Sequence, residues 1–195
     1  MFDSIIAICI GVGLAASCGM RVFAPLLVVS VAAKADFLTL SESFDWLASY
    51  PAMAAMGTAT LLEVAAYYVP WVDNALDTVA TPAAVIAGVI VSAACLTEMD
   101  PLLKWSVAII AGGGTAGAVK VGASGLRVGS TATTAGVGNP ILSTLEWLGS
   151  LLLSAMSVLV PILAALVAVV LVVLGIRFGA TVFARFRERK TAKDL

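Results

Sequence analysis

Residues 11–27 read GVGLAASCGMRVFAPLL, and this stretch decides the fold because it places a single charge inside an apolar helix. Arg21 is the only charged residue between Asp3 and Lys34. The apolar segment around it is about thirty residues long, whereas about 20 residues of helix cross the hydrocarbon core of a bilayer. A charge at the centre of such a helix costs about 2.5 to 3.5 kcal/mol on insertion scales, so we expect Arg21 to have a partner or a function.

The composition indicates an integral membrane protein. Of the 195 residues, 61% are hydrophobic and 12% are charged, whereas soluble domains carry about 25% charged residues. The net charge is −1 and no broad basic patch is present, so we expect no nucleic-acid partner. The chain has no histidine, and its three cysteines lack CxxC spacing, so neither a metal site nor another cofactor is expected.

Apolar stretches separated by short polar linkers predict an all-α fold, a polytopic membrane bundle of five or six spans in one domain over residues 1–195. The apolar stretches cover residues 4–33, 51–69, 82–97, 102–119 and 141–183. Several stretches start where a capping residue precedes a proline, which favours the first helical turn. These predicted helix starts are Ser49-Tyr50-Pro51, Thr81-Pro82, Asp100-Pro101 and Asn139-Pro140.

The last apolar stretch is too long for one span. At 1.5 Å per residue its 43 residues would reach about 64 Å, twice the hydrocarbon thickness. Either two spans meet near Val160-Pro161 with almost no loop, or a short half-helix from Pro140 leads into one long tilted span. The basic tail at residues 184–195 predicts a cytoplasmic C-terminus by the positive-inside rule.

Two short segments resemble each other and indicate an internal repeat. Residues 16–22 read ASCGMRV, and residues 123–128 read ASGLRV. Repeat halves would then cover residues 1–98 and 99–183. Small transporters often consist of two inverted repeats whose broken or re-entrant helices meet near the bilayer midplane, with half-helix N-termini directed at an anionic substrate.

Each repeat half contains residues that could interrupt a helix. The first break is expected around Ser17–Ala24, with Pro25 restarting the helix. The second is expected over residues 122–140, GASGLRVGSTATTAGVGNP, with Asn139 capping the helix that starts at Pro140 beside Arg127. Together the breaks predict an anion site. Its expected substrate-binding residues are Arg21, Arg127, Ser17, Ser130, Thr131, Thr133, Thr134 and Asn139.

Other interpretations of the charged residues stay open at this point. The tract around Arg127 also fits an aqueous loop, and Arg21 also fits a structural ion pair with Glu63, the one carboxylate inside the second apolar stretch. Glu63 could instead gain and lose a proton together with substrate binding. Lys120 and Glu146 flank the second break and are candidates for the same proton or ion-pair coupling.

Three quoted stretches resemble a known family. GLAASCGMRVFAPLL, YVPWVDNALDTVATP and STATTAGVGNPILSTLE resemble a family of bacterial integral-membrane proteins classified as domain of unknown function 4126. The resemblance implies a bacterial inner membrane location, and it implies no activity. Relatives often carry a histidine where this chain has Lys120.

The sequence therefore favours a small membrane transporter or channel for an anionic solute. The alternative is a non-catalytic membrane scaffold or accessory subunit in which the arginines and glycines only fix helix packing. An enzyme is not expected, because the chain lacks histidine, a metal-ligand cluster and a GxSxG motif. Membrane lipids, the anionic solute and further copies of the same chain are the expected partners.

Overall fold

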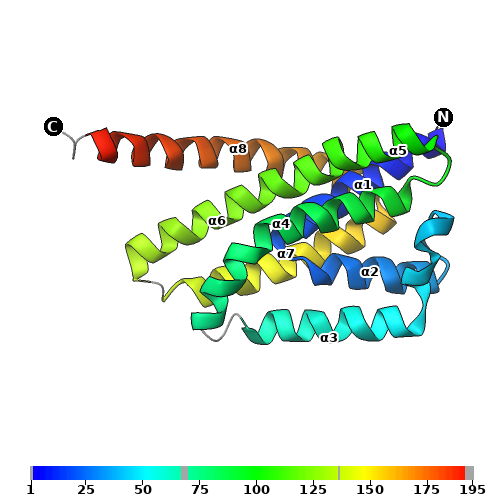
Figure 1. Ribbon diagram of the computed structural model, residues 1–195, viewed down its shortest axis with the longest axis horizontal. Coiled ribbons are helices and arrows are strands. Elements are labelled where there is room, and N and C mark those ends of the chain that lie inside the picture. Colours follow the sequence, from blue (N-terminus) through cyan, green and yellow to red (C-terminus); the bar gives the residue numbers. More distant parts are fainter. Residues whose placement is uncertain (1, 67–69, 136, 192–195) are drawn as a thin grey trace.

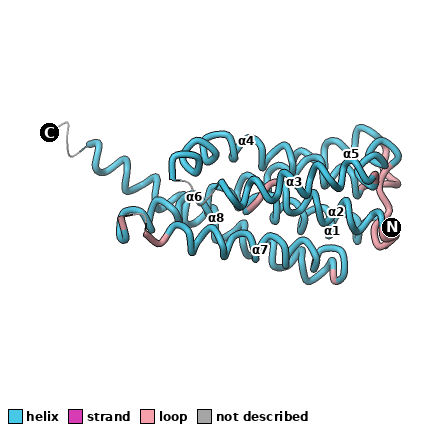
Figure 2. Tube along the Cα trace, turned by 90° about the horizontal axis from the view of Figure 1, so that it is seen from below, coloured by secondary structure: helices cyan, strands magenta, loops and turns pink. Residues whose placement is uncertain are grey.

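The computed structural model describes the backbone of residues 2–66, 70–135 and 137–191, and the side chains of residues 3–66, 79–135 and 137–181. Over these residues the chain is all-helical and contains no strand, as Figures 1 and 2 show. The all-α prediction is confirmed. The elements are α1 (Phe2–Met20), α2 (Phe23–Lys34), the 3₁₀ helix η1 (Glu42–Ala48), α3 (Tyr50–Ala66), α4 (Pro70–Cys95), α5 (Pro101–Val107), the π-helical η2 (Ala108–Gly113), α6 (Gly114–Thr134), α7 (Asn139–Leu159) and α8 (Pro161–Thr191).

Four helical segments of the described chain are long and apolar enough to cross a membrane, which indicates a membrane protein. They are Asp3–Met20, Pro101–Thr134, Asn139–Leu159 and Pro161–Thr181. Two shorter apolar helices, Phe23–Lys34 and Val79–Cys95, accompany them. The predicted five or six spans remain a prediction, because the count depends on whether these shorter helices also cross.

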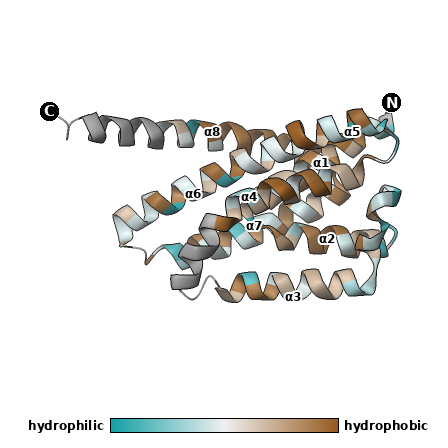
Figure 3. Ribbon diagram, viewed as in Figure 1, coloured by the Kyte–Doolittle hydropathy of each residue, from teal (hydrophilic) through white to brown (hydrophobic). Residues whose placement is uncertain are grey.

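Helix α1 lies at the centre of the bundle and packs against α4, α6, α7 and α8. Its inward residues Leu14, Ala15, Ala16 and Cys18 are fully buried. Mostly small side chains let the neighbouring helices approach closely, which is the usual basis of helix packing in membranes. Figure 3 shows the apolar residues spread along the helices, with hydrophilic residues at the end of the bundle that carries the N-terminus and at places on α3, α6 and α7.

The first predicted helix break is confirmed. Helix α1 ends at Met20 and α2 begins at Phe23, so only Arg21 and Val22 separate them. Figure 1 shows the chain reversing there, with α2 returning toward the end from which α1 started. Helix α2 begins at Phe23, so Pro25 lies in its first turn and is not its first residue. N–H groups of the first turn have no acceptor within the helix, so the missing N–H of Pro25 costs no helical hydrogen bond.

The second predicted break, over residues 122–140, is far shorter than expected, because only residues 135–138 lie between α6 and α7. Helix α6 runs without interruption through Arg127 to Thr134 and ends only at Ala135, whose φ is 51°. The polar residues remain helical because their hydroxyls bond within the helix: Thr133 Oγ1 donates to the Gly129 carbonyl and Thr134 Oγ1 to the Ser130 carbonyl. The similar segments 16–22 and 123–128 therefore differ locally, one ending a helix and the other continuing it.

The other predicted helix starts have mixed outcomes. Asp100 Oδ1 accepts from the Leu102 N–H, and Ser49 Oγ accepts from the Ala52 N–H, as expected of capping residues. Pro82 instead lies inside α4, because that helix already begins at Pro70.

Two predictions concern the C-terminal third of the chain. Helices α7 and α8 meet at Val160 with almost no loop, which confirms the first of the two interpretations of the last stretch. The side chains of the basic tail at residues 184–195 lie outside the described residues, so its cytoplasmic orientation stays a prediction.

The packing of α6 on α8 gives a stability prediction. A Cβ added at Gly122 would lie 2.7 Å from the Gly175 Cα, and backbone atoms cannot move aside cheaply. We expect Gly122→Ala to lower the free energy of unfolding by about 1 to 3 kcal/mol, because overpacking forces the helices apart. Denaturation in detergent micelles measures the change.

Gly129→Ala is the matched control for this prediction, because an added Cβ there meets nothing within 4 Å. Within helix α6 it should be neutral or stabilise by up to about 1 kcal/mol through helix propensity. Equal stability of the two variants would contradict the close α6–α8 contact.

Candidate functional site

The centre of the candidate site is one carboxylate that binds two arginines. Arg21 Nη2 donates to Glu146 Oε2 at 2.9 Å, and Arg127 Nη2 donates to the same oxygen at 2.5 Å. Arg127 Nε lies 3.4 Å from the other carboxylate oxygen. Arg21 Nη2 also donates to the Ser143 carbonyl at 2.9 Å. Glu146, in the third turn of α7, thus joins the reversal after α1 to helix α6.

The three charged groups are shielded from solvent by the helices around them. The side chains of Arg21 and Arg127 are 1% and 6% exposed, and that of Glu146 is 11% exposed. Attraction between charges is stronger in such surroundings than in water, and each charge also loses its hydration. The contacts among these three groups therefore hold the start of the reversal after α1 against α6 and α7.

Glu63 has a separate role in the structure. Its carboxylate oxygens accept from the backbone N–H groups of Val22 at 3.1 Å and Phe23 at 3.3 Å. These N–H groups belong to the start of α2, where helical N–H groups have no partner within the helix and the dipole favours a negative charge. Glu63 therefore caps α2 from the neighbouring helix α3. The ion pair that was expected for Arg21 at Glu63 is made with Glu146.

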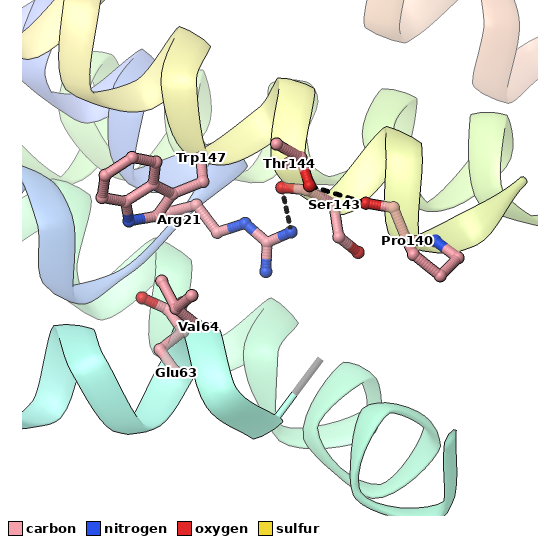
Figure 4. A pocket seen from close by; sticks show the side chains of 7 residues that line it. All are labelled: Arg21, Glu63, Val64, Pro140, Ser143, Thr144 and Trp147. Atoms are coloured by element: carbon pink, nitrogen blue, oxygen red, sulfur yellow. Dashed lines mark hydrogen bonds between the residues drawn. The ribbon is translucent and has the colours of Figure 1, made fainter. Parts of the chain in front are cut away.

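A cavity of about 190 Å³ lies beside Arg21, between α3 and α7. Figure 4 shows the Arg21 guanidinium extending into this space, with α7 on one side and α3 on the other. The lining residues are Arg21, Glu63, Val64, Pro140, Ser143, Thr144 and Trp147. Since a water molecule needs only about 10 to 15 Å³ on this measure, the cavity has room for several waters or a small solute.

Polar groups in the cavity wall add hydrogen-bonding capacity. Trp147 Nε1 is buried and has no hydrogen-bond partner among the described residues. An indole N–H is a donor only, so an acceptor in the cavity would satisfy it. Ser143 Oγ accepts from Arg127 Nη2 at 3.4 Å, which directs its own proton elsewhere. Arg21, Trp147 and Ser143 thus offer donors, the groups that bind an anion.

The structure does not bring the hydroxyl residues that follow Arg127 in the sequence to this cavity. Ser130, Thr131, Thr133 and Thr134 lie in the last turns of α6, and three of the four are exposed. Asn139 does not cap α7 as expected, since the N-cap is Gly138, and its amide nitrogen donates to Thr131 Oγ1 at 3.0 Å.

Two further predicted residues are buried nearby. Ser17 lies inside α1, where its hydroxyl donates to the Gly13 carbonyl and its own carbonyl accepts from Ser150. Lys120 is buried on α6, seven residues before Arg127 and hence on the same face of the helix.

Sequence reasoning missed the cavity residues of α7. Pro140, Ser143, Thr144 and Trp147 are spaced so that they share one helix face, at steps of three and four residues. The helix start at Asn139-Pro140 was predicted, so this periodicity was available as a signal. The identity of the facing helix was not available, because no local pattern shows that α3 packs there.

The position of the site along the bundle follows from helix lengths. Asp3 lies in a small hollow with Thr97 and Glu98, which marks one polar end. From Asp3 to Met20 α1 rises about 27 Å, close to the thickness of about 30 Å of a hydrocarbon core. This geometry favours a site near the opposite boundary of the apolar layer over the expected midplane position.

Comparison with known proteins places the chain in one family. Residues 8–180 match a family model described as "Domain of unknown function (DUF4126)". No curated protein and no solved structure matches the chain.

The cap that Glu63 provides can be tested by substitution. We expect Glu63→Ala to lower the free energy of unfolding by about 1 to 3 kcal/mol, because the Val22 and Phe23 N–H groups then lose their acceptor. Chemical denaturation in detergent measures the change. Glu42→Ala is the control, since Glu42 is an exposed acidic residue. A Glu63→Ala protein as stable as the Glu42→Ala protein would contradict the capping role.

Proposed function

The chain belongs to the family described as a domain of unknown function, DUF4126, and we propose that it binds a small anion beside Arg21 and moves it across a membrane as a transporter or channel. The observation that carries the proposal is the pair of buried arginines that share Glu146 beside a cavity of about 190 Å³. Ionisable groups inside membrane bundles are expensive to bury and often mark the path of a substrate or ion.

The hydrogen-bond donors at the cavity support an anion over a cation. The Arg21 guanidinium extends into the cavity, and the Glu63 carboxylate, which also lines it, accepts from the Val22 and Phe23 N–H groups at the positive dipole end of α2. Hydrogen-bond donors from Trp147 and Ser143 border the same space. A carboxylate or a small oxyanion would supply acceptors for these donors.

Glu146 acts in this proposal as an internal anion. Its carboxylate accepts hydrogen bonds from Nη2 of Arg21 and from Nη2 of Arg127. An anion that enters the cavity competes with Glu146 for Arg21, and Glu146 then stays with Arg127. Through this exchange the buried Arg21 always has an anionic partner, either Glu146 or the bound anion. A buried arginine without such a partner would cost several kcal/mol of stability.

The alternative proposal is a membrane scaffold or accessory subunit. It is supported by the close small-residue packing of Gly122 on Gly175, which a static bundle would also need. The cavity next to Arg21 weighs against it, because a purely structural ion cluster gains nothing from empty space beside it. For either function we propose a bacterial inner membrane location with the C-terminus in the cytoplasm.

Removing either arginine tests the anion site. We expect Arg21→Gln to abolish stabilisation by anions and Arg127→Gln to weaken it, because Arg21 lines the cavity whereas Arg127 contacts it through Ser143 and Glu146. The measurements are the shift in melting temperature with acetate, phosphate and chloride, and the flux of the same anions in liposomes. Lys34→Gln, which removes a cation in the last turn of α2, is the control. Unchanged shifts and flux in both arginine variants would overturn the proposal.

Removing the internal competitor tests the role of Glu146. Without anion, Glu146→Gln should be less stable by about 3 to 5 kcal/mol, since two buried guanidinium groups lose their counter-charge. Saturating anion should restore much of that stability, so the anion-induced shift in melting temperature should exceed that of the wild type. A loss of stability that no anion reduces would show that Glu146 is only a structural partner.

A further inference from the structure

An apolar groove of about 470 Å³ lies on the opposite face of α7 from the cavity. At about 100° per residue, Leu142, Leu145 and Glu146 point away from the face that carries Ser143 and Trp147. The groove is bounded by α6, α7 and α8, with Met20 of α1 at its base. It is a separate space from the proposed anion cavity, and Glu146, which binds Arg21 of that cavity, contributes to its wall.

The size and lining of the groove fit a hydrocarbon chain. Its lining residues are apolar except Glu146, namely Met20, Val119, Gly122, Ala123, Leu126, Leu142, Leu145, Leu171, Leu174, Gly175 and Phe178. A dry apolar cavity of about 150 Å³ in another protein holds one benzene ring of six carbons. On that scale the groove of about 470 Å³ holds about eighteen carbons, which is one acyl chain.

The floor of the groove lies where α6 and α8 are in backbone contact. Gly122 and Gly175 line the groove there, and a Cβ on Gly122 would lie 2.7 Å from the Gly175 Cα. Leu126, Leu145 and Leu174 around this floor are about half exposed or more. Because the surrounding helices are apolar enough to cross a membrane, the groove faces the lipid phase rather than water.

The basic end of α8 identifies the headgroup. Leu174 and Phe178 line the groove, and the exposed Arg177 lies between them on the same helix. Helix α8 continues to Thr191, and its sequence there includes Arg185, Arg187, Arg189 and Lys190. Basic residues at the cytoplasmic end of a membrane helix attract anionic lipids by about 1 kcal/mol per charge near the surface.

We propose that the groove between α6, α7 and α8 binds one acyl chain of an anionic phospholipid whose headgroup lies at the basic end of α8. The acyl chain contributes apolar contact along the groove, and the headgroup contributes attraction to the exposed Arg177. A zwitterionic lipid offers the same chain without a net negative charge, so it binds more weakly.

Native mass spectrometry of the full chain, extracted from vesicles of phosphatidylglycerol and phosphatidylcholine in equal amounts, tests this site. The wild type should retain one phosphatidylglycerol per chain, several-fold in preference to phosphatidylcholine. Ala123→Phe and Leu145→Trp should each lose this lipid, because the larger side chain occupies the groove. Arg177→Gln should keep a lipid but with a reduced preference for the anionic one.

Two matched variants separate the site from general lipid contact. Leu152→Phe enlarges an exposed residue of α7 outside the groove, and Lys34→Gln removes a charge near the end of α2. Both should retain the lipid as the wild type does, and melting temperatures confirm that all variants fold.

Several results would overturn the proposal. Lipid retained by both groove-filling variants would place the lipid elsewhere. Equal retention of the two phospholipids would contradict the proposed headgroup contact. A dimer without bound lipid would show that a second copy of the chain covers the groove.

Discussion

The whole arrangement depends on the carboxylate of Glu146, which two buried guanidinium groups share. Arg21 follows the last residue of α1, Arg127 lies within α6, and Glu146 lies in the third turn of α7. In an apolar bundle neither arginine can be buried alone without a cost of several kcal/mol, so this contact fixes how the three helices meet. It also places the Arg21 guanidinium beside a cavity.

Glu63 solves a second problem that the reversal at Arg21 creates. Ending α1 and starting α2 within two residues exposes N–H groups at the head of α2, where apolar surroundings offer few acceptors. A carboxylate from α3 supplies the acceptors and meets the positive end of the helix dipole. The two acidic residues thus have different roles. Glu146 pairs with the side chains of Arg21 and Arg127, and Glu63 accepts hydrogen bonds from backbone N–H groups of α2.

Helix α7 separates two spaces. One face presents Ser143, Thr144 and Trp147 to the cavity beside Arg21, and the other presents Leu142 and Leu145 to the apolar groove. Glu146 stands at the groove wall while its carboxylate binds Arg21, a residue of the cavity. A change in the hydrogen-bond partners of Glu146 would therefore alter both the cavity and the wall of the groove. A lipid in the groove and an anion in the cavity would meet at this one side chain.

Hydropathy and local chemistry determined most of the helices, the membrane character and the interruption at Arg21, since these depend on composition and on residues adjacent in sequence. They left two interpretations of the last apolar stretch, and the structure decided for a junction at Val160. The continuity of α6 and the cap on α2 depended on tertiary structure. Glycine, serine and threonine can interrupt a helix or lie within one, and the helices packed against them decide which. Gly122, for example, stays within α6, where it packs on Gly175 of α8. The choice of Glu146 over Glu63 for Arg21 was likewise beyond the sequence, because both carboxylates are far from residue 21 along the chain and only the packing of α7 and α3 around the reversal assigns each its role.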